Sequence, residues 1–247
     1  MLNVKDLSVT LQGKELLKSV SFSLAPARLT VLLGKNGSGK TTLLRALGQL
    51  CPYQGQVLLD GADVAAMPIR ERAKRIGIFP QILPSLTYTV EKLVLFGRTP
   101  HVPFLGHYSE EDRRAVRTSM EKCGITSFAD RPLNTLSGGE RQRAFLAMTL
   151  AQETNVLLLD EPVTYLDPEA RRDFYTLLRQ LAEEGKTVFT VLHDISEGLQ
   201  IADDVLLLEG GKLLFAGTKE NVLSTRLLEE TFRIDRHVTL DGEAFFS

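Results

Sequence analysis

The sequence predicts an α/β fold built on a mainly parallel sheet, and three observations favour it. A continuous apolar run at residues 29–33 is typical of a strand buried on both faces, and a glycine-rich turn joins it to a helical pattern. Strand and helix patterns alternate through the last third of the chain, as crossover connections require. The first third instead shows period-two alternation, which predicts a small antiparallel β portion near the N-terminus.

The N-terminal third is expected to be mostly strands. Residues 2–11 alternate apolar and polar side chains, and residues 20–24 do so again after a turn-like Gln-Gly-Lys sequence. A helix is predicted at residues 41–49, where leucines recur at helical spacing. Further strands are expected at residues 56–59 and 75–79.

The middle of the chain predicts a helical lobe. Prolines and glycines interrupt its first part, and Ser109 and Asp112 then have the spacing that begins a helix. Helices are expected at residues 90–96, 109–122 and 140–152. We interpret this part as a lobe at about residues 83–150, inserted in a single domain that spans residues 1–247.

The last third predicts the rest of the parallel sheet. Strands are expected at residues 156–159, 187–192 and 205–208, and helices at residues 168–183 and 195–202. Glu209-Gly210-Gly211-Lys212 predicts a hairpin turn. In the C-terminal extension, residues 218–247, the apolar side chains Leu227, Leu228 and Phe232 favour a helix face that packs on the core.

Charge and composition limit the functions open to this chain. With 29 Lys+Arg against 31 Asp+Glu and a net charge of −2, it lacks the basic surplus that nucleic-acid binding needs. Cys51 and Cys123 are too few for a disulfide framework or a metal cluster, and we expect reduced structural thiols. No apolar run approaches the roughly 18 residues that cross a bilayer, so a membrane role must come through a partner.

A phosphate-binding loop is predicted between the buried strand and the first helix. The segment from Gly34 to Thr42 reads Gly-Lys-Asn-Gly-Ser-Gly-Lys-Thr-Thr, and its glycines allow backbone N–H groups to curl around phosphates. Lys40 supplies a positive charge, Thr41 a hydroxyl for Mg²⁺, and the helix N-terminus a favourable dipole. The alternative is a chance glycine-rich turn, which the flanking strand and helix disfavour.

Two acids end the apolar strand at residues 156–159. Asp160 is placed to reach a metal ion, commonly through a water molecule, while Glu161 faces the γ-phosphate and can polarise the attacking water. A strand that merely ends in solvated acids is the alternative, which the phosphate loop upstream disfavours.

A second glycine-containing helix start lies between these two motifs. Leu136-Ser137-Gly138-Gly139-Glu140 places two glycines and a serine hydroxyl at a helix N-terminus, a second place where an anion can bind. Alone it could be an ordinary helix cap. In order between the two other motifs, it indicates a protein that uses one phosphate-binding helix end itself and presents the other to a neighbour.

These three motifs make residues 2–217 resemble the ATP-binding cassette (ABC) ATPases. The resemblance implies a P-loop NTPase with a RecA-like core, ATP and Mg²⁺ as cofactors, and Glu161 as the catalytic glutamate. Residues 34–42 look like the Walker A loop and residues 156–161 like Walker B. Residues 136–140 look like the ABC signature, which in this family contacts ATP bound to the opposite subunit.

The resemblance also gives roles to three isolated residues. Gln81 is similar to the Q-loop glutamine, which senses Mg²⁺ and the membrane partner; Asp167 is similar to the D-loop aspartate; and His193 to the switch histidine at the γ-phosphate. Without it, His193 would be a capping or solvated histidine and Gln81 would carry no signal. The catalytic set implied is Lys40, Gln81, Glu161 and His193, and the metal-binding set is Thr41, Gln81 and Asp160. The nucleotide-binding set is Gly34, Lys35, Asn36, Gly37, Ser38, Gly39, Lys40, Thr41, Thr42, Ser137, Gly138, Gly139 and Asp167.

Two positions depart from the family pattern. Leu11 stands where an aromatic residue usually stacks on adenine, which implies weaker selection of the base or packing by another residue such as Phe22. Val163 stands where many members have threonine, at a position not expected to take part in chemistry.

A segment of the lobe suggests what the ATPase drives. Gly97-Arg98-Thr99-Pro100-His101 is similar to a segment of importers for ferric siderophores, haem and cobalamin, and the residues before Asp167 agree with that branch. The alternative interpretation of this segment is a surface loop without diagnostic value. Import of another small solute and a soluble ABC ATPase acting on macromolecules stay open as functions. A P-loop kinase or GTPase is disfavoured, because no Asn-Lys-x-Asp guanine motif is present.

The importer branch implies a set of partners. We expect an ATP-dependent homodimer, docked under two transmembrane permease subunits as a peripheral protein of the cytoplasmic face. A periplasmic or lipid-anchored substrate-binding protein would deliver the cargo, and no nucleic-acid partner is expected. The stretch after the cassette is too short for the additional C-terminal domain of many sugar importers.

Overall fold

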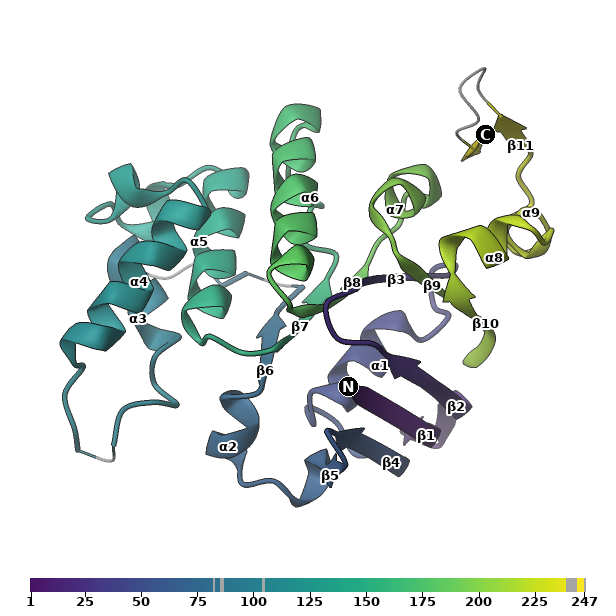
Figure 1. The fold of residues 1–247 in the computed structure, drawn as a ribbon, viewed down its shortest axis with the longest axis horizontal. Coiled ribbons are helices and arrows are strands. Elements are labelled where there is room, and N and C mark those ends of the chain that lie inside the picture. The colour runs from purple at the N-terminus through teal and green to yellow at the C-terminus, as the bar shows by residue number, and fades with distance from the viewer. Residues whose placement is uncertain (82, 85–86, 104, 239–243, 247) are drawn as a thin grey trace. The chain divides into compact units, whose positions relative to one another are not determined.

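The computed structural model describes residues 1–81, 83–84, 87–103, 105–238 and 244–246 (Figure 1). The chain divides into two compact units. Unit 1 comprises Met1–Ala66 and Ala182–Ser247, and unit 2 comprises Met67–Leu181. The predicted lobe at residues 83–150 lies within unit 2. No helix in the described ranges has an apolar stretch long enough to cross a membrane.

Unit 1 holds an antiparallel sheet at its N-terminal end. Its strands are β1 (Leu2–Leu11), β2 (Lys14–Leu24), β4 (Gln54–Leu59) and β5 (Ala62–Asp63), in the order β2–β1–β4–β5. Inward-facing apolar residues alternate with exposed polar ones, and Leu2, Leu7 and Val9 of β1 are fully buried. The small antiparallel portion that alternation predicted is thereby confirmed.

A second group of strands in unit 1 is arranged around β3 (Leu29–Leu33); its members run parallel except the last in the sequence, which is antiparallel to its neighbour. The order is β10–β9–β3–β8, formed with β8 (Thr187–Val191), β9 (Asp204–Glu209) and β10 (Lys212–Thr218). Strand β3 runs parallel to both neighbours, and every residue of β3 and β8 is buried. A continuous apolar run therefore did mark a strand covered on both faces.

The helices of unit 1 follow its strands. They are α1 (Lys40–Leu47), α7 (Ile195–Ile201), α8 (Lys219–Leu223) and α9 (Leu227–Phe232), and the hairpin strands β11 (Arg236–Val238) and β12 (Ala244–Phe246) come last. In α9, Leu228 is fully buried while Leu227 and Phe232 are partly exposed. Of the three apolar side chains predicted to pack on the core, only Leu228 is therefore fully buried.

Unit 2 is mostly helical around two parallel strands. Its elements are α2 (Ile69–Ala73), β6 (Ile76–Phe79), α3 (Val90–Phe96), α4 (Glu110–Lys122), α5 (Gly138–Ala151), β7 (Val156–Asp160) and α6 (Pro168–Glu183). Helices α3, α4 and α5 pack against one another (Figure 1). Helix α5 begins two residues before the predicted start, because Ser137 caps it. The sequence did not reveal α2, which buries none of its side chains and so has no apolar periodicity.

Both cysteines are free thiols, as predicted. Burial raises the pKa of the Cys123 thiol to about 12, and burial also raises the pKa of Cys51. Neither sulfur is therefore an activated nucleophile.

Candidate functional site

The phosphate loop joins β3 to α1 through glycines that the backbone requires. Gly37 and Gly39 have positive φ angles of 77° and 107°, a region that favours glycine. A Cβ atom on Gly39 would lie 2.8 Å from the Leu17 Cδ2 atom, and one on Gly34 would lie 2.3 Å from the Leu208 carbonyl oxygen. The loop can therefore keep its course only with glycine at these positions.

Lys40 is held inside this loop. Its side chain is buried, and its Nζ atom donates hydrogen bonds to the carbonyl oxygens of Gly34 at 2.7 Å and Lys35 at 3.2 Å. The N-cap of α1, Gly39, offers no side-chain cap, and the first turn contains no acid. A buried cation at the N-terminus of a helix whose first turn contains no acid is an arrangement that suits phosphate.

The other loop residues differ in exposure. Lys35, Asn36 and Gly37 are exposed, whereas Thr41 and Thr42 are partly buried. Ser38 is buried, and its Oγ atom has no hydrogen-bond partner among the described residues. A buried hydroxyl without a partner in a glycine loop fits a site that receives a polar ligand.

The end of β7 carries the two predicted acids. All residues of β7 are buried, and Asp160 closes the strand at 3% exposure. Glu161 follows in a left-handed conformation with φ of 51°, which costs a non-glycine residue about 1 kcal/mol or more. Its carbonyl oxygen accepts a hydrogen bond from the Thr164 hydroxyl at 3.0 Å.

The start of α5 is closed by its own side chains. The Ser137 Oγ atom accepts a hydrogen bond from the Glu140 N–H at 3.3 Å, and the Glu140 Oε2 atom accepts one from the Ser137 N–H at 2.7 Å. This capping box uses the serine as an acceptor, so its hydroxyl proton can still be donated to an external anion. A Cβ on Gly138 would lie 3.3 Å from the Tyr165 Cβ atom, and the signature therefore packs directly on the D-loop.

The three isolated residues lie at the ends of secondary-structure elements. The Asp167 Oδ1 atom accepts a hydrogen bond from the Ala170 N–H at 2.8 Å, so this carboxylate caps α6. Gln81 is exposed just after β6, and His193 is exposed between β8 and α7. Of the catalytic set, Lys40 and His193 belong to unit 1, and Gln81 and Glu161 to unit 2.

The donor atoms predicted for the metal suit magnesium. Thr41 offers a hydroxyl, Gln81 an amide oxygen and Asp160 a buried carboxylate, and these hard oxygen ligands are the ones Mg²⁺ prefers. No group of three His, Cys, Asp or Glu side chains in the described chain could hold a metal by itself. That is expected where phosphate oxygens and water complete the coordination.

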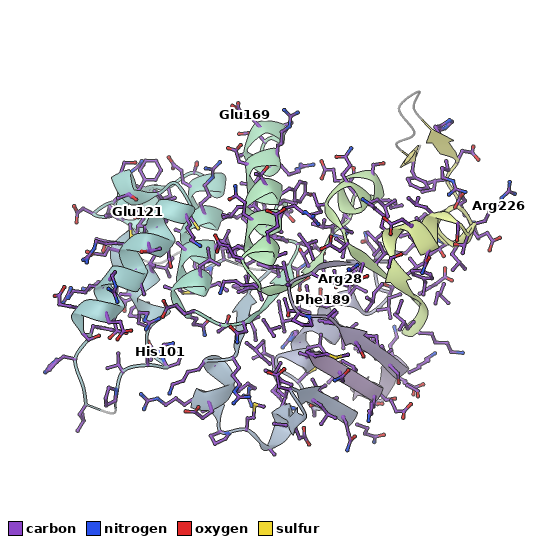
Figure 2. The ribbon with its side chains drawn as sticks, viewed as in Figure 1. Arg28, His101, Glu121, Glu169, Phe189 and Arg226 are labelled. Atoms are coloured by element: carbon purple, nitrogen blue, oxygen red, sulfur yellow. The ribbon has the colours of Figure 1, made fainter. Side chains whose placement is uncertain are left out.

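Neither of the two residues considered for contact with adenine offers a free aromatic face in the described structure. Leu11, at the end of β1, is partly exposed. Phe22 is 7% exposed and stacks on Phe189, with ring centroids 6.1 Å apart; Figure 2 shows Phe189 within unit 1. Phe22 is therefore a core residue whose ring face is already covered.

Arg98 was noted from the sequence only as part of a family-like segment, yet it joins helices of unit 2. Its buried guanidinium bonds the Asp112 carboxylate at 2.8 Å, the Ala151 carbonyl oxygen at 2.7 Å and the Glu153 carboxylate at 2.6 Å. Next to it the His101 Nε2 atom is 2.9 Å from the Gln152 carbonyl oxygen (Figure 2). Residues 97–101 are therefore held to the rest of unit 2 by hydrogen bonds and do not form a loose surface loop.

Asp112 connects Arg98 to the start of α4. Burial acts to raise the pKa of Asp112, but hydrogen bonds from Arg98 and Ser109 outweigh it and hold the pKa below its ordinary value. The carboxylate is consequently charged in the folded protein, where it completes the capping box with Ser109. The sequence could reveal this box but not the arginine that pairs with it.

Comparison with known proteins now decides the family. Residues 17–164 match the family model described as ABC transporter. The chain belongs to this family. The ferric enterobactin transport ATP-binding protein of Escherichia coli is 39% identical over 87% of this chain and 80% of its own length. The iron(3+)-hydroxamate import ATP-binding protein of Bacillus subtilis is 34% identical over 97% of this chain and 90% of its length.

Solved ABC structures have the same fold. A metal-chelate type ABC transporter in an inward-facing conformation matches all of this chain and 96% of its own, with a TM-score of 0.85 and 27% identity. A dimeric cassette bound to ADP and Pi matches 89% of this chain and 99% of its own, with a TM-score of 0.78 and 26% identity. The predicted ABC ATPase fold and family are confirmed. The ABC ATP-binding subunits of transporters, to which this chain belongs, bind nucleotide and hydrolyse ATP to power transport.

Proposed function

We propose that this chain is the ATP-hydrolysing subunit of an importer for a metal chelate such as an iron siderophore, haem or a cobalamin. One observation carries the proposal: the relatives include iron(3+)-hydroxamate import and ferric enterobactin transport ATP-binding proteins that cover 97% and 87% of the chain, and the hemin import ATP-binding protein of Pseudomonas entomophila is 37% identical over 95% of it. The structural neighbour of metal-chelate type supports the same class of cargo. Import of a different small solute is the alternative.

The proposed hydrolysis uses the groups already described. The glycine loop and Lys40 hold the phosphates of ATP, with the N-terminus of α1 adding a favourable dipole. Thr41, Gln81 and Asp160 would hold Mg²⁺, which neutralises phosphate charge when bound. Glu161 orients and polarises the attacking water, and His193 contacts the γ-phosphate.

We further propose that two copies of the chain form the catalytic unit. In each site the phosphate loop of one copy would face the signature Ser137-Gly138-Gly139 and the D-loop residue Asp167 of the other. The exposed hydroxyl of Ser137 supports this role, since its oxygen accepts the Glu140 N–H and its proton can still be donated to phosphate. A twofold axis would then give two equivalent sites. The dimeric relative supports this assembly.

The partners follow from the cargo. The dimer would dock as a peripheral protein on the cytoplasmic face of a membrane, beneath transmembrane permease subunits. A periplasmic or lipid-anchored substrate-binding protein would bring the chelate to the permease. In this proposal the present chain binds the nucleotide and not the chelate, so the choice of cargo would rest with these partners.

Purification of the tagged chain from its native membrane tests this assignment. We expect a permease to co-purify, and vesicles containing that complex to take up a radiolabelled ferric siderophore, haem or cobalamin when Mg-ATP is present on the side of this chain. Uptake of another solute instead would show that the transporter imports a different class of cargo. Recovery with macromolecules and no permease would support the soluble ATPase instead.

Glu161→Gln tests the role of the general base. The amide cannot polarise water as the carboxylate does, so ATP should still bind while turnover falls by at least a hundredfold, within the usual range for a lost general base. The variant should also accumulate as an ATP-bound dimer in gel filtration. Near-normal turnover would remove Glu161 from this role.

Mixing two inactive variants tests the shared site. Lys40→Ala damages the phosphate loop, and Ser137→Arg blocks the signature. A mixed dimer gathers both lesions in one site and leaves the other with intact Lys40 and Ser137, so an ATP-dependent dimer, which neither variant should form alone, should form on mixing. If no mixed dimer forms with Mg-ATP, the sites are not shared and the dimer proposal fails.

A further inference from the structure

The hairpin turn between β9 and β10 lies directly against the phosphate loop, although it comes far later in the sequence. The Gly211 N–H donates a hydrogen bond to the Ser38 carbonyl oxygen at 3.0 Å. The Gly211 carbonyl oxygen in turn accepts one from the Lys18 N–H at 2.8 Å. All three residues belong to unit 1, so Gly211 is a junction between the hairpin, the phosphate loop and β2.

Two more contacts join the same segments. The Leu208 carbonyl oxygen lies so close to Gly34 that a Cβ atom on Gly34 would be only 2.3 Å from it. The Lys35 Nζ atom lies 3.8 Å from the Glu209 Oε1 atom, a partly exposed ion pair. The beginning and the middle of the phosphate loop are thus both supported by the end of β9 and its turn.

The Gly211 hydrogen bond has a consequence for the next amide. In a trans peptide the carbonyl and the N–H point in opposite directions, and the described chain contains no cis peptide bond. Because Gly211 holds the Ser38 carbonyl oxygen on the hairpin side, the Gly39 N–H of the same peptide must point away from the hairpin. Gly39 is the N-cap of α1, at the helix end where phosphate binds.

We infer that Gly211 is a positioning residue for the nucleotide phosphates. Its N–H sets the orientation of the peptide between Ser38 and Gly39, and thereby presents the Gly39 N–H to phosphate before the ligand arrives. Such preorganisation strengthens binding because the loop need not reorder when phosphate enters.

Only glycine fits at this junction. Gly211 has φ of 81°, and a Cβ there would lie 2.5 Å from the Leu16 carbonyl oxygen, a backbone atom that cannot turn aside. Gly210 provides a matched control in the same turn. It also has a positive φ, of 55°, but a Cβ on it meets nothing within 4 Å.

Gly211→Ala and Gly210→Ala therefore separate positioning from general hairpin strain. We expect Gly211→Ala to weaken binding of ATP and of inorganic tripolyphosphate by a similar factor of about ten, because both ligands use the same N–H groups. Gly210→Ala should change either affinity less than twofold. Tripolyphosphate carries no base, so equal losses place the defect at the phosphates. Equal affinities for the two variants, or loss for ATP alone, would overturn the inference.

A measurement on the unaltered protein removes any dependence on how the variants fold. Scalar coupling across the hydrogen bond between the Gly211 amide nitrogen and the Ser38 carbonyl carbon should be detected by NMR, both without ligand and with Mg-ATP. Its absence in the ATP-bound chain would overturn the proposal. Both experiments use the isolated chain, so their outcome is independent of which cargo the transporter moves.

Discussion

Helices α1 and α5 both begin at glycine-rich turns, but their first turns are completed in opposite ways. At α1 no side chain caps the helix, no acid is present in the first turn, and Lys40 places a positive charge in the loop. At α5 the Ser137 and Glu140 side chains form a reciprocal cap, with a carboxylate in the first turn. The α1 end is prepared to hold an anion by itself, whereas the α5 end is already satisfied and can offer only the serine proton.

A glycine-rich helix start is therefore not by itself a binding site. Whether such a helix end binds an anion depends on whether side chains of the same chain already bond its N–H groups and balance its positive dipole. Helix α4 gives a third case, because its Ser109–Asp112 cap has the same pattern as that of α5 but is covered by Arg98. The three helix ends can therefore be tested separately: α1 for phosphate binding, α5 for contact with nucleotide in a second copy, and α4 for stability alone.

Lys40→Ala should produce the largest effect. It removes the positive charge at α1. Loss of two charge-assisted hydrogen bonds to phosphate, at about 2 kcal/mol each, should weaken ATP binding roughly a thousandfold. In the isolated chain Ser137→Ala should change that affinity less than twofold, since α5 is expected to act on another copy. Calorimetric titration of both variants, with exposed Lys5→Ala as a charge control, measures the contrast. Similar losses for Lys40→Ala and Ser137→Ala would contradict it.

Asp112→Ala should be the next largest effect, and it should be confined to stability. Removing one partner of a buried ion pair costs about 3 kcal/mol, although Glu153 still contacts Arg98. Denaturant unfolding should show this loss without a change in ATP affinity.

The pH dependence of that stability has a definite sign. Because the pKa of Asp112 is lowered in the folded chain, its contribution to stability is complete above its ordinary pKa of 3.8. It is lost as the pH falls below that value and through the lower folded pKa. Stability measured against pH should therefore fall less steeply in acid for Asp112→Ala than for the unaltered chain; equal slopes would show that Asp112 is not responsible.

Ser137→Ala and Ser109→Ala form a matched pair with a smaller effect. Each removes an N-cap hydroxyl and should cost about 1 kcal/mol of stability. Only Ser137→Ala should also lower the ATPase rate of the assembled protein, by about tenfold, because one charge-assisted hydrogen bond to phosphate is lost. Steady-state turnover at saturating ATP distinguishes the two. If both variants lose turnover alike, the cap of α5 is only structural.

Leu11→Tyr should give the smallest change. Phosphate contacts at α1 should supply most of the affinity, so GTP and ATP should compete on nearly equal terms in the unaltered chain. A tyrosine stacked on adenine adds about 1 kcal/mol, or roughly fivefold tighter ATP binding. Competition binding with both nucleotides checks this. Unchanged affinity would mean that another side chain already covers the base.

Most helices, strands and family motifs could be predicted from the order of the amino acids. Apolar runs such as residues 29–33 and helical spacing after Lys40 depend on neighbours within a few residues, so β3 and α1 could be predicted closely. The capping pattern at Ser109 also predicted where α4 begins, because a cap bonds only to the next turn.

Contacts between segments that are distant in the sequence became visible only in the folded chain. Arg98 gave no sign in the sequence that it would pair with Asp112 and Glu153, nor Phe22 that it would stack on Phe189. The contact of Gly211 with the phosphate loop is of the same kind. Such contacts join residues far apart along the chain, so no local period or spacing encodes them, and they arise only when folding brings buried groups to shared hydrogen-bond partners and packing space.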